Sequence, residues 1–173
     1  MYMDIILVDE MDQAIGTMGK MEVHQKALLH RAFSIFILNS KGEMLLQQRA
    51  LNKYHSPGLW TNACCSHPSP GMNTLHAASK RLYEEMGFRT HLEKAFDFIY
   101  KASFDNGLTE HEFDHVYVGE YDGEIIPNPR EVSAFCFKIL PEIKLDMQSY
   151  PSRYTAWFKI AFPKVEAYLA SNS

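Results

Sequence analysis

The stretch Thr74-Leu-His-Ala-Ala-Ser-Lys-Arg-Leu-Tyr-Glu-Glu-Met-Gly87 decides the fold of this chain. Its apolar residues recur every three or four positions, as they do along one face of a helix: Leu75, Ala78, Leu82 and Met86. Gly87 follows at the position where a left-handed helix cap is common. The stretch therefore predicts an amphipathic helix over residues 74–86.

Short apolar runs on both sides of this helix predict strands. Six runs qualify: residues 5–8, 32–38, 44–48, 95–102, 112–120 and 134–139. Asn39-Ser-Lys-Gly42 predicts a hairpin between the second and third runs, and Asp105-Asn-Gly107 predicts a turn between the fourth and fifth.

The remaining segments complete an α+β pattern. Residues 56–71 are broken by Pro and Gly and predict no single regular element. The C-terminal third predicts helices that are interrupted at Pro151 and at Pro163. Strand pairs come first, one helix is central and helices come last, which indicates a mixed α+β fold.

Composition indicates a protein with a packed core. The chain has 173 residues, 46% of them hydrophobic, and its 17 Lys and Arg against 21 Asp and Glu give a net charge of −4. That length and apolar content fit one domain over residues 1–173 and exclude intrinsic disorder. Mild acidity without any run of Lys or Arg argues against a nucleic-acid partner.

Cysteine usage and the N-terminus predict a cytoplasmic protein. Of three cysteines, Cys64 and Cys65 are adjacent, which excludes a disulfide scaffold. Residues 1–10 lack the features of a signal peptide, and no apolar run approaches the roughly 20 residues of a membrane span. We expect a soluble protein of a reducing compartment with no membrane partner, whose oligomeric state the sequence does not define.

Four groups of side chains could carry chemistry, and the first lies on the helix. At 100° per residue, Arg81 and Glu85 fall on one flank of the apolar face, whereas Glu84 points nearly opposite to it. An i,i+4 ion pair between Arg81 and Glu85, worth roughly a few tenths of a kcal/mol, is the simpler interpretation of this helix alone. A ligand role for Glu85 is the alternative.

The second group is Glu110-His-Glu112. In a strand, period-two alternation places Glu110 and Glu112 on one face and His111 on the other. Two neighbouring carboxylates repel each other unless a cation lies between them or one of them binds a proton. A solvated strand face is the simpler interpretation of these residues by themselves.

The third and fourth groups contain cysteine and histidine. In an extended backbone Cys65 and His67 point the same way, so they could form a nucleophile, an acid–base pair or a metal pair, while Cys64 faces the core. A structural role for Cys65 is the alternative. The gap of six between His24 and His30 does not match a helical zinc pair, and alone it predicts no metal site.

Together these groups belong to an ordered set of motifs. The set is Gly16-Thr17, Lys20, His24, His30, Gln48-Arg-Ala50, Lys53, Pro57-Gly-Leu-Trp-Thr-Asn62, Cys65-Ser-His-Pro68, Arg81-Leu-Tyr-Glu-Glu-Met-Gly87, Tyr100 and Glu110-His-Glu112. In this order they resemble the type 1 isopentenyl-diphosphate Δ-isomerases of the Nudix superfamily. The resemblance spans Gly16 to Glu112 and reaches Trp157 more loosely.

The resemblance implies a Nudix-type α/β/α sandwich with mixed sheets and a central helix. It also implies an isomerase of isoprenoid biosynthesis, whose small-molecule substrate is a prenyl diphosphate. Such enzymes interconvert isopentenyl and dimethylallyl diphosphate by adding and removing a proton through a tertiary carbocation.

The same resemblance implies one divalent metal held by five side chains: His24, His30, His67, Glu110 and Glu112. Three imidazoles and two carboxylates suit Mn²⁺, Mg²⁺ or Zn²⁺, and six-coordination is favoured over tetrahedral zinc. A cation here would relieve the repulsion between the two carboxylates.

Cys65 and Glu112 are implied to be the acid–base pair on opposite faces of the substrate, with Tyr100 assisting Glu112. Trp157 and Trp60 could each present an aromatic face to the carbocation. Core packing is the alternative role of both tryptophans.

The diphosphate is implied to contact four basic residues: Lys20, Arg49, Lys53 and Arg81. Glu85 would hold a Mg²⁺ shared with the phosphate oxygens. The resemblance thus favours the functional interpretation of the Arg81 and Glu85 flank.

Two other functions remain open. A Nudix hydrolase of a diphosphate would share the anion site, but Arg81 stands where hydrolases carry the first carboxylate of their Arg-Glu-x-x-Glu-Glu motif. A non-catalytic metal- or thiol-binding module would use His24, His67 and Cys65, and it leaves the remaining motifs unexplained.

Overall fold

The computed structural model describes residues 3–173, and its central helix, α2, spans Thr74–Met86 as predicted. Asn73 caps its start by accepting a hydrogen bond from the His76 N–H at 3.1 Å. At its end Gly87 has φ 78°, and a side chain there would lie 2.3 Å from the carbonyl oxygen of Ile126, so glycine is required. The predicted apolar face is wrong at Leu75, which is 43% exposed.

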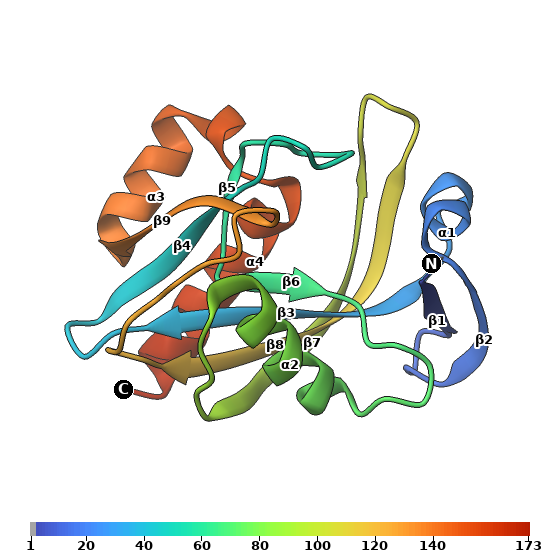
Figure 1. Cartoon of the computed structure of the whole chain (residues 1–173), viewed down its shortest axis with the longest axis horizontal. Helices are drawn as coiled ribbons and strands as arrows, with labels where there is room; N and C mark the ends of the chain where they lie inside the picture. The colour runs from blue at the N-terminus through green and yellow to red at the C-terminus, as the bar shows by residue number, and fades with distance from the viewer. Residues whose placement is uncertain (1–2) are drawn as a thin grey trace.

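The strands form one curled, mixed sheet (Figure 1). They are β1 (Asp4–Val8), β2 (Ala14–Gly19), β3 (His30–Leu38), β4 (Glu43–Arg49), β5 (Trp60–Thr61), β6 (Cys64–Ser66), β7 (Leu92–Ser103), β8 (Thr109–Glu120) and β9 (Val132–Ile139). β3 is central: it pairs in parallel with β8 along its whole length, and antiparallel with β6. β7 and β8 form the predicted antiparallel pair across the turn at residues 105–107.

The predicted hairpin of residues 32–38 and 44–48 is wrong beyond its turn. β3 and β4 pair at Leu38 and Met44, and then the two strands separate. β4 pairs instead with β9 and β5. The sheet curls around the core, so β3 and β4 diverge after the turn. Most of β3 then pairs with β8, and most of β4 pairs with β9.

The other helices are α1 (Lys20–Lys26), α3 (Leu140–Ser149) and α4 (Ala156–Ser171). A short 3-10 turn at Pro151–Arg153 separates α3 from α4, as predicted. The predicted break at Pro163 is wrong, since Pro163 lies inside α4. Its neighbours Phe162 and Val165 are buried, and this packing outweighs the loss of one backbone hydrogen bond. No helix within residues 3–173 is long and apolar enough to cross a membrane.

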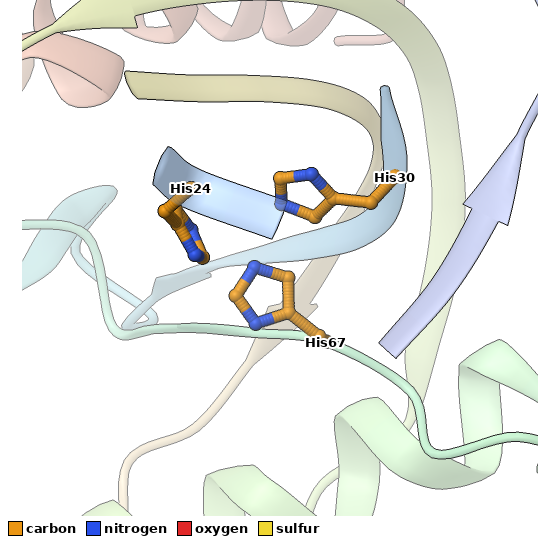
Figure 2. A group of neighbouring side chains, drawn as sticks. All are labelled: His24, His30 and His67. Carbon is orange, nitrogen blue, oxygen red and sulfur yellow. The ribbon is translucent and has the colours of Figure 1, made fainter. Parts of the chain in front are cut away.

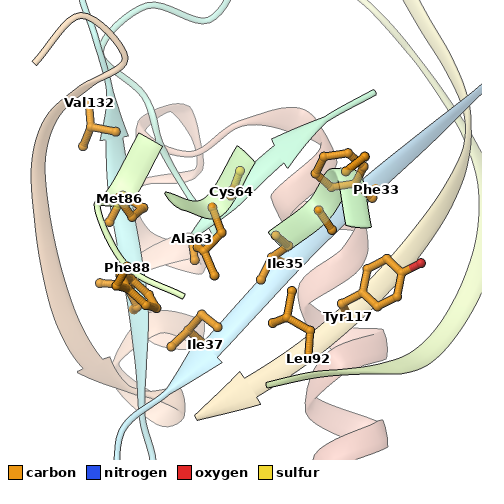
Figure 3. Close-up of a cluster of buried hydrophobic side chains, with 14 residues drawn as sticks. Phe33, Ile35, Ile37, Ala63, Cys64, Met86, Phe88, Leu92, Tyr117 and Val132 are labelled. Carbon is orange, nitrogen blue, oxygen red and sulfur yellow. The ribbon is translucent and has the colours of Figure 1, made fainter. Parts of the chain in front are cut away.

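Alternation along β3 divides the core into two layers. Phe33, Ile35 and Ile37 pack in a cluster with α2 on one face of the sheet (Figure 3). Phe36 packs in a second cluster with Phe158 and other residues of α4 on the opposite face. The sheet therefore lies between helices, as the α/β/α sandwich requires. His30 and Ser34 lie on the same face of β3 as Phe36. The site described below is on this face of the sheet.

Candidate active site

A cavity on this face gathers most of the predicted site residues. Its lining includes Lys20, Arg49, Lys53, Cys65, His67, Arg81, Glu85, Glu110, Glu112 and Trp157. These residues come from α1, the end of β4, β6, α2, β8 and α4, which the sheet topology brings together. One cavity is thus lined by residues as far apart in sequence as Lys20 and Trp157, which are separated by 137 positions.

Two buried carboxylates are part of the cavity lining. Glu110 and Glu112 are 5% and 6% exposed and lie on one face of β8, whereas the Nδ1 of His111 on the other face bonds to the Ala27 carbonyl oxygen at 3.1 Å. Tyr100 donates from its hydroxyl to Glu110 Oε2 at 2.8 Å and also to Glu112. Burial, together with both carboxylates, raises the pKa of Tyr100, so its hydroxyl keeps the proton it donates.

Three buried histidines lie close to these carboxylates, and Figure 2 shows that their rings converge. Their ligand nitrogens all lie within 4.8 Å of one another: His24 from α1, His30 from β3 and His67 from the segment after β6. His24 Nε2 is 3.7 Å from Glu110 Oε1, while the Nε2 atoms of His30 and His67 are 3.5 and 3.0 Å from Glu112 Oε2.

The chemistry of this donor set fits a divalent metal. His24 and His30 use Nδ1 to bond carbonyl oxygens at 2.6 and 2.8 Å, which leaves the lone pair of each Nε2 facing the carboxylates. Both Nε2 atoms are buried without a hydrogen-bond partner among the described residues. Burial and then the neighbouring His30 lower the pKa of His67 well below its usual value, which favours the neutral imidazole that binds metals.

The two adjacent cysteines point in opposite directions. Cys64 is fully buried and packs in the core next to α2 (Figure 3). Cys65 lines the cavity. Its thiol donates a hydrogen bond to Asn62 Oδ1 at 3.2 Å and lies 3.4 Å from Ser34 Oγ. Burial, and next the nearby Asp114, raise the pKa of Cys65, so the thiol is protonated at neutral pH.

The basic residues of the cavity include two incompletely satisfied guanidinium groups. Arg81 donates hydrogen bonds to Glu84 and to Glu85 at 2.7 Å each. The contact with Glu85 is the i,i+4 pair that the helix predicts. The Nε atoms of Arg81 and Arg49 are nevertheless buried without a partner in the described part of the chain. Lys53 pairs with Glu131, which also lies 3.7 Å from Arg81.

The structure separates the two tryptophans. Trp157 lines the cavity, its ring 5.1 Å from the guanidinium carbon of Arg49. Trp60 is not part of the lining and packs against the core cluster that contains Phe36. Of the two tryptophans, Trp157 is the one whose side chain lines this cavity.

Several residues of the site are absent from the sequence-based prediction. His55 is 6% exposed and lines the cavity, 3.4 Å from Glu110 Oε1. Ser34 connects Cys65 with the buried Asp114, to which its hydroxyl donates at 2.7 Å. Asp114 continues the alternation of Glu110 and Glu112, and this period-two pattern is the signal that could have revealed it.

Comparison with known proteins first defines the class. The NUDIX domain family matches residues 28–158, and the solved structure of DR0079 from Deinococcus radiodurans is similar with a TM-score of 0.75. That likeness covers 91% of this chain and 96% of the other at 17% identity, and it shows the shared fold. The chain is thus a Nudix protein.

Closer relatives then define the family within this class. The isopentenyl-diphosphate Delta-isomerase of Pectobacterium atrosepticum is 49% identical over 95% of this chain and 92% of its own length. The enzyme of the same name from Serratia proteamaculans is 50% identical over 89% of this chain and 86% of its own. The chain belongs to the isopentenyl-diphosphate Delta-isomerase family.

Proposed function

We propose that this isomerase converts isopentenyl diphosphate to dimethylallyl diphosphate with Cys65 and Glu112 as its acid–base pair. One group adds a proton to C4 of the alkene, which leaves a tertiary carbocation at C3. The other removes a proton from C2, and the new double bond forms between C2 and C3 with the diphosphate intact. The supporting observation is that a protonated thiol and a buried carboxylate line the same cavity.

The protonation states of the pair suit this chemistry. Burial raises the pKa of Glu112, but hydrogen bonding with Glu110 and with Tyr100 is among the effects that outweigh burial and lower it. Glu112 is therefore an ionised base, and Cys65 is a neutral acid. Tyr100 keeps its proton and stabilises the charge on Glu112. An alkene is a very weak base, so exclusion of water around the pair favours proton transfer to carbon.

His24, His30, His67, Glu110 and Glu112 would hold a divalent metal, for which Mn²⁺, Mg²⁺ and Zn²⁺ are the candidates. The partnerless Nε2 atoms of His24 and His30 support this assignment. When bound, the cation supplies positive charge that keeps two neighbouring carboxylates ionised and strengthens the acids around it.

The diphosphate would bind to Lys20, Arg49, Lys53 and Arg81. Within residues 3–173 the buried Nε atoms of Arg49 and Arg81 lack a partner, and planar guanidinium groups suit phosphate oxygens as acceptors. Glu85 is 6% exposed, accepts from Gln47 at 3.2 Å, and would share a Mg²⁺ with the same oxygens.

Trp157 would stabilise the carbocation through the face of its ring. Its position in the lining of the cavity that also contains Cys65 and Glu112 supports this role.

The protein would function in the reducing environment of the cytoplasm. Its three cysteines, Cys64, Cys65 and Cys136, form no disulfide, which supports this location.

Proton NMR of isopentenyl diphosphate in D₂O with the purified protein and Mg²⁺ tests the proposed function. We expect new dimethylallyl methyl signals that carry deuterium, with no release of phosphate. Phosphate release would assign the protein to the hydrolases instead. Absence of any reaction with Mg²⁺, Mn²⁺ and Zn²⁺ would contradict the proposed activity.

A further inference from the structure

A fourth histidine, His55, has no role in the function proposed above. It lies in the segment after β4, is 6% exposed and lines the same cavity as the predicted metal ligands. Its ring centroid is 6.4 Å from that of His24, so it belongs to the wall next to the three histidines. A buried polar ring at this position requires an account of what its nitrogens do.

Aromatic neighbours from separate parts of the fold fix the orientation of this ring. It stacks on Phe104, next to the β7–β8 turn, with centroids 4.9 Å apart and an interplanar angle of 9°. Trp157 of α4 and the adjacent Tyr54 meet it edge-on at 5.7 and 4.6 Å. Because three rings pack around it, the direction of each His55 nitrogen is set by the fold.

The partners of the two nitrogens define the tautomer. Nδ1 lies 3.4 Å from the hydroxyl oxygen of Ser56, which can donate to it. Nε2 lies 3.4 Å from Glu110 Oε1, an acceptor. A neutral imidazole that accepts at Nδ1 carries its proton on Nε2, which here points at the carboxylate. Burial lowers the pKa of His55 to about 4, in agreement with a neutral ring.

Both oxygens of Glu110 then have a donor beside them. Tyr100 donates to Oε2 at 2.8 Å, and His55 lies beside Oε1, 3.4 Å away. The Nε2 of His24, which is 3.7 Å from the same Oε1, faces it with a lone pair and cannot be that donor. Within residues 3–173, His55 is thus the imidazole that can donate to this oxygen.

We infer that His55 is a positioning residue, which donates from Nε2 to Glu110 Oε1 and holds this carboxylate in the orientation that binds the divalent cation. The inference rests on the metal site proposed above. Hydrogen bonds of this kind orient ligating groups, and their loss typically lowers metal affinity by about 10- to 100-fold.

Two substitutions separate the hydrogen bond from the packing of the ring. His55→Phe keeps the aromatic contacts with Phe104 and Trp157 but has no donor. His55→Gln loses the stack but retains an N–H group that can reach Glu110. We expect the dissociation constant for Mn²⁺ to rise by about 10-fold or more in His55→Phe, and His55→Gln to restore a substantial part of the affinity.

Titration of the metal-free full-length protein with Mn²⁺, followed by the electron paramagnetic resonance signal of free Mn²⁺, measures these constants. Thermal unfolding of each variant checks that it folds, and His76→Phe, on the exposed surface of α2, controls for the added ring. Equal affinity of the wild type and His55→Phe would overturn the inference while the metal site stands. Weak binding by both variants would overturn it too, because packing alone would then explain the loss. A wild type that binds no Mn²⁺ would overturn the metal site itself.

Discussion

Tyr100 lies directly opposite Glu112 in the antiparallel register of β7 and β8, and its hydroxyl donates to that carboxylate. Side chains of directly opposed residues lie on the same face of a sheet, so the register itself delivers the donor to the base. We expect Tyr100→Phe to lower kcat by roughly 10- to 100-fold, because a hydrogen bond to a buried charge contributes about 1.5–3 kcal/mol. Steady-state rates of isopentenyl diphosphate turnover measure the effect.

Tyr117→Phe is the matched control for this change. Tyr117 is also buried on β8, but it packs in the core next to α2 (Figure 3). It should lose little activity. Similar losses in the two variants would show that the Tyr100 hydroxyl has no special place in the reaction.

Removal of metal should affect both activity and stability. A chelator should abolish turnover and lower the melting temperature, since a ligand present at 100 times its dissociation constant stabilises the native state by about 2.7 kcal/mol. Adding Mn²⁺, Mg²⁺ or Zn²⁺ back identifies the ions that restore both. His30→Ala should remove the response to chelator, whereas His76→Ala should keep it. A melting temperature that does not change with chelator would argue against the five-ligand site.

The two adjacent cysteines should separate chemistry from packing. Cys65→Ala should lower kcat by at least about 100-fold, the usual effect of losing a general acid or base, and should leave the melting temperature nearly unchanged. Cys64→Ala should lower the melting temperature and leave kcat nearly unchanged, because it leaves a small cavity in the core next to α2. Turnover and thermal unfolding of both variants decide this. Full activity of Cys65→Ala would exclude the thiol as the acid.

The two tryptophans allow a similar separation. Trp157→Leu should lower kcat by up to roughly 30-fold, since a desolvated cation–π contact is worth about 2 kcal/mol, and Trp157→Phe should retain part of the rate. Trp60→Leu should mainly lower stability, because Trp60 packs against the cluster around Phe36. If Trp157→Leu turned over substrate as fast as Trp157→Phe, the aromatic face would not matter.

Local patterns in the sequence predict the elements better than their partners. The helix over residues 74–86 and the strands around residues 105–107 depend on neighbours in sequence, and the structure confirms them. The β3–β4 hairpin fails because its pairing is decided by strands up to 96 residues away, as where Glu43 of β4 lies opposite Ile139 of β9. The strand β2 and the helix α1 are not predicted, since both are short and carry a weak apolar pattern.

The same limit applies to the site. The gap of six between His24 and His30 does not predict a metal site by itself, because α1 ends at a left-handed cap on Ala27 and the chain then turns into β3. Only the fold brings the two rings to 5.1 Å. The alternation of Glu110 and Glu112 is a local property and was predictable. His55 belongs to no periodic pattern, and beyond its neighbours Tyr54 and Ser56 the contacts that define its role come from β8 and α4.

His115 should give the stability a measurable dependence on pH away from the cavity. Burial, and then Lys94, lower the pKa of His115 from its usual value, although Asp12 Oδ2 lies 2.9 Å from its Nε2 and raises it. Below a pH of about 6.5 the unfolded imidazole binds a proton that the folded one resists, so the free energy of unfolding should fall as the pH drops. His115→Gln should show a smaller fall over the same range, while His91→Gln, at an exposed position, should follow the wild type. Urea unfolding between pH 7.5 and pH 5 measures the slopes, and parallel curves for the wild type and His115→Gln would show that His115 contributes nothing to them.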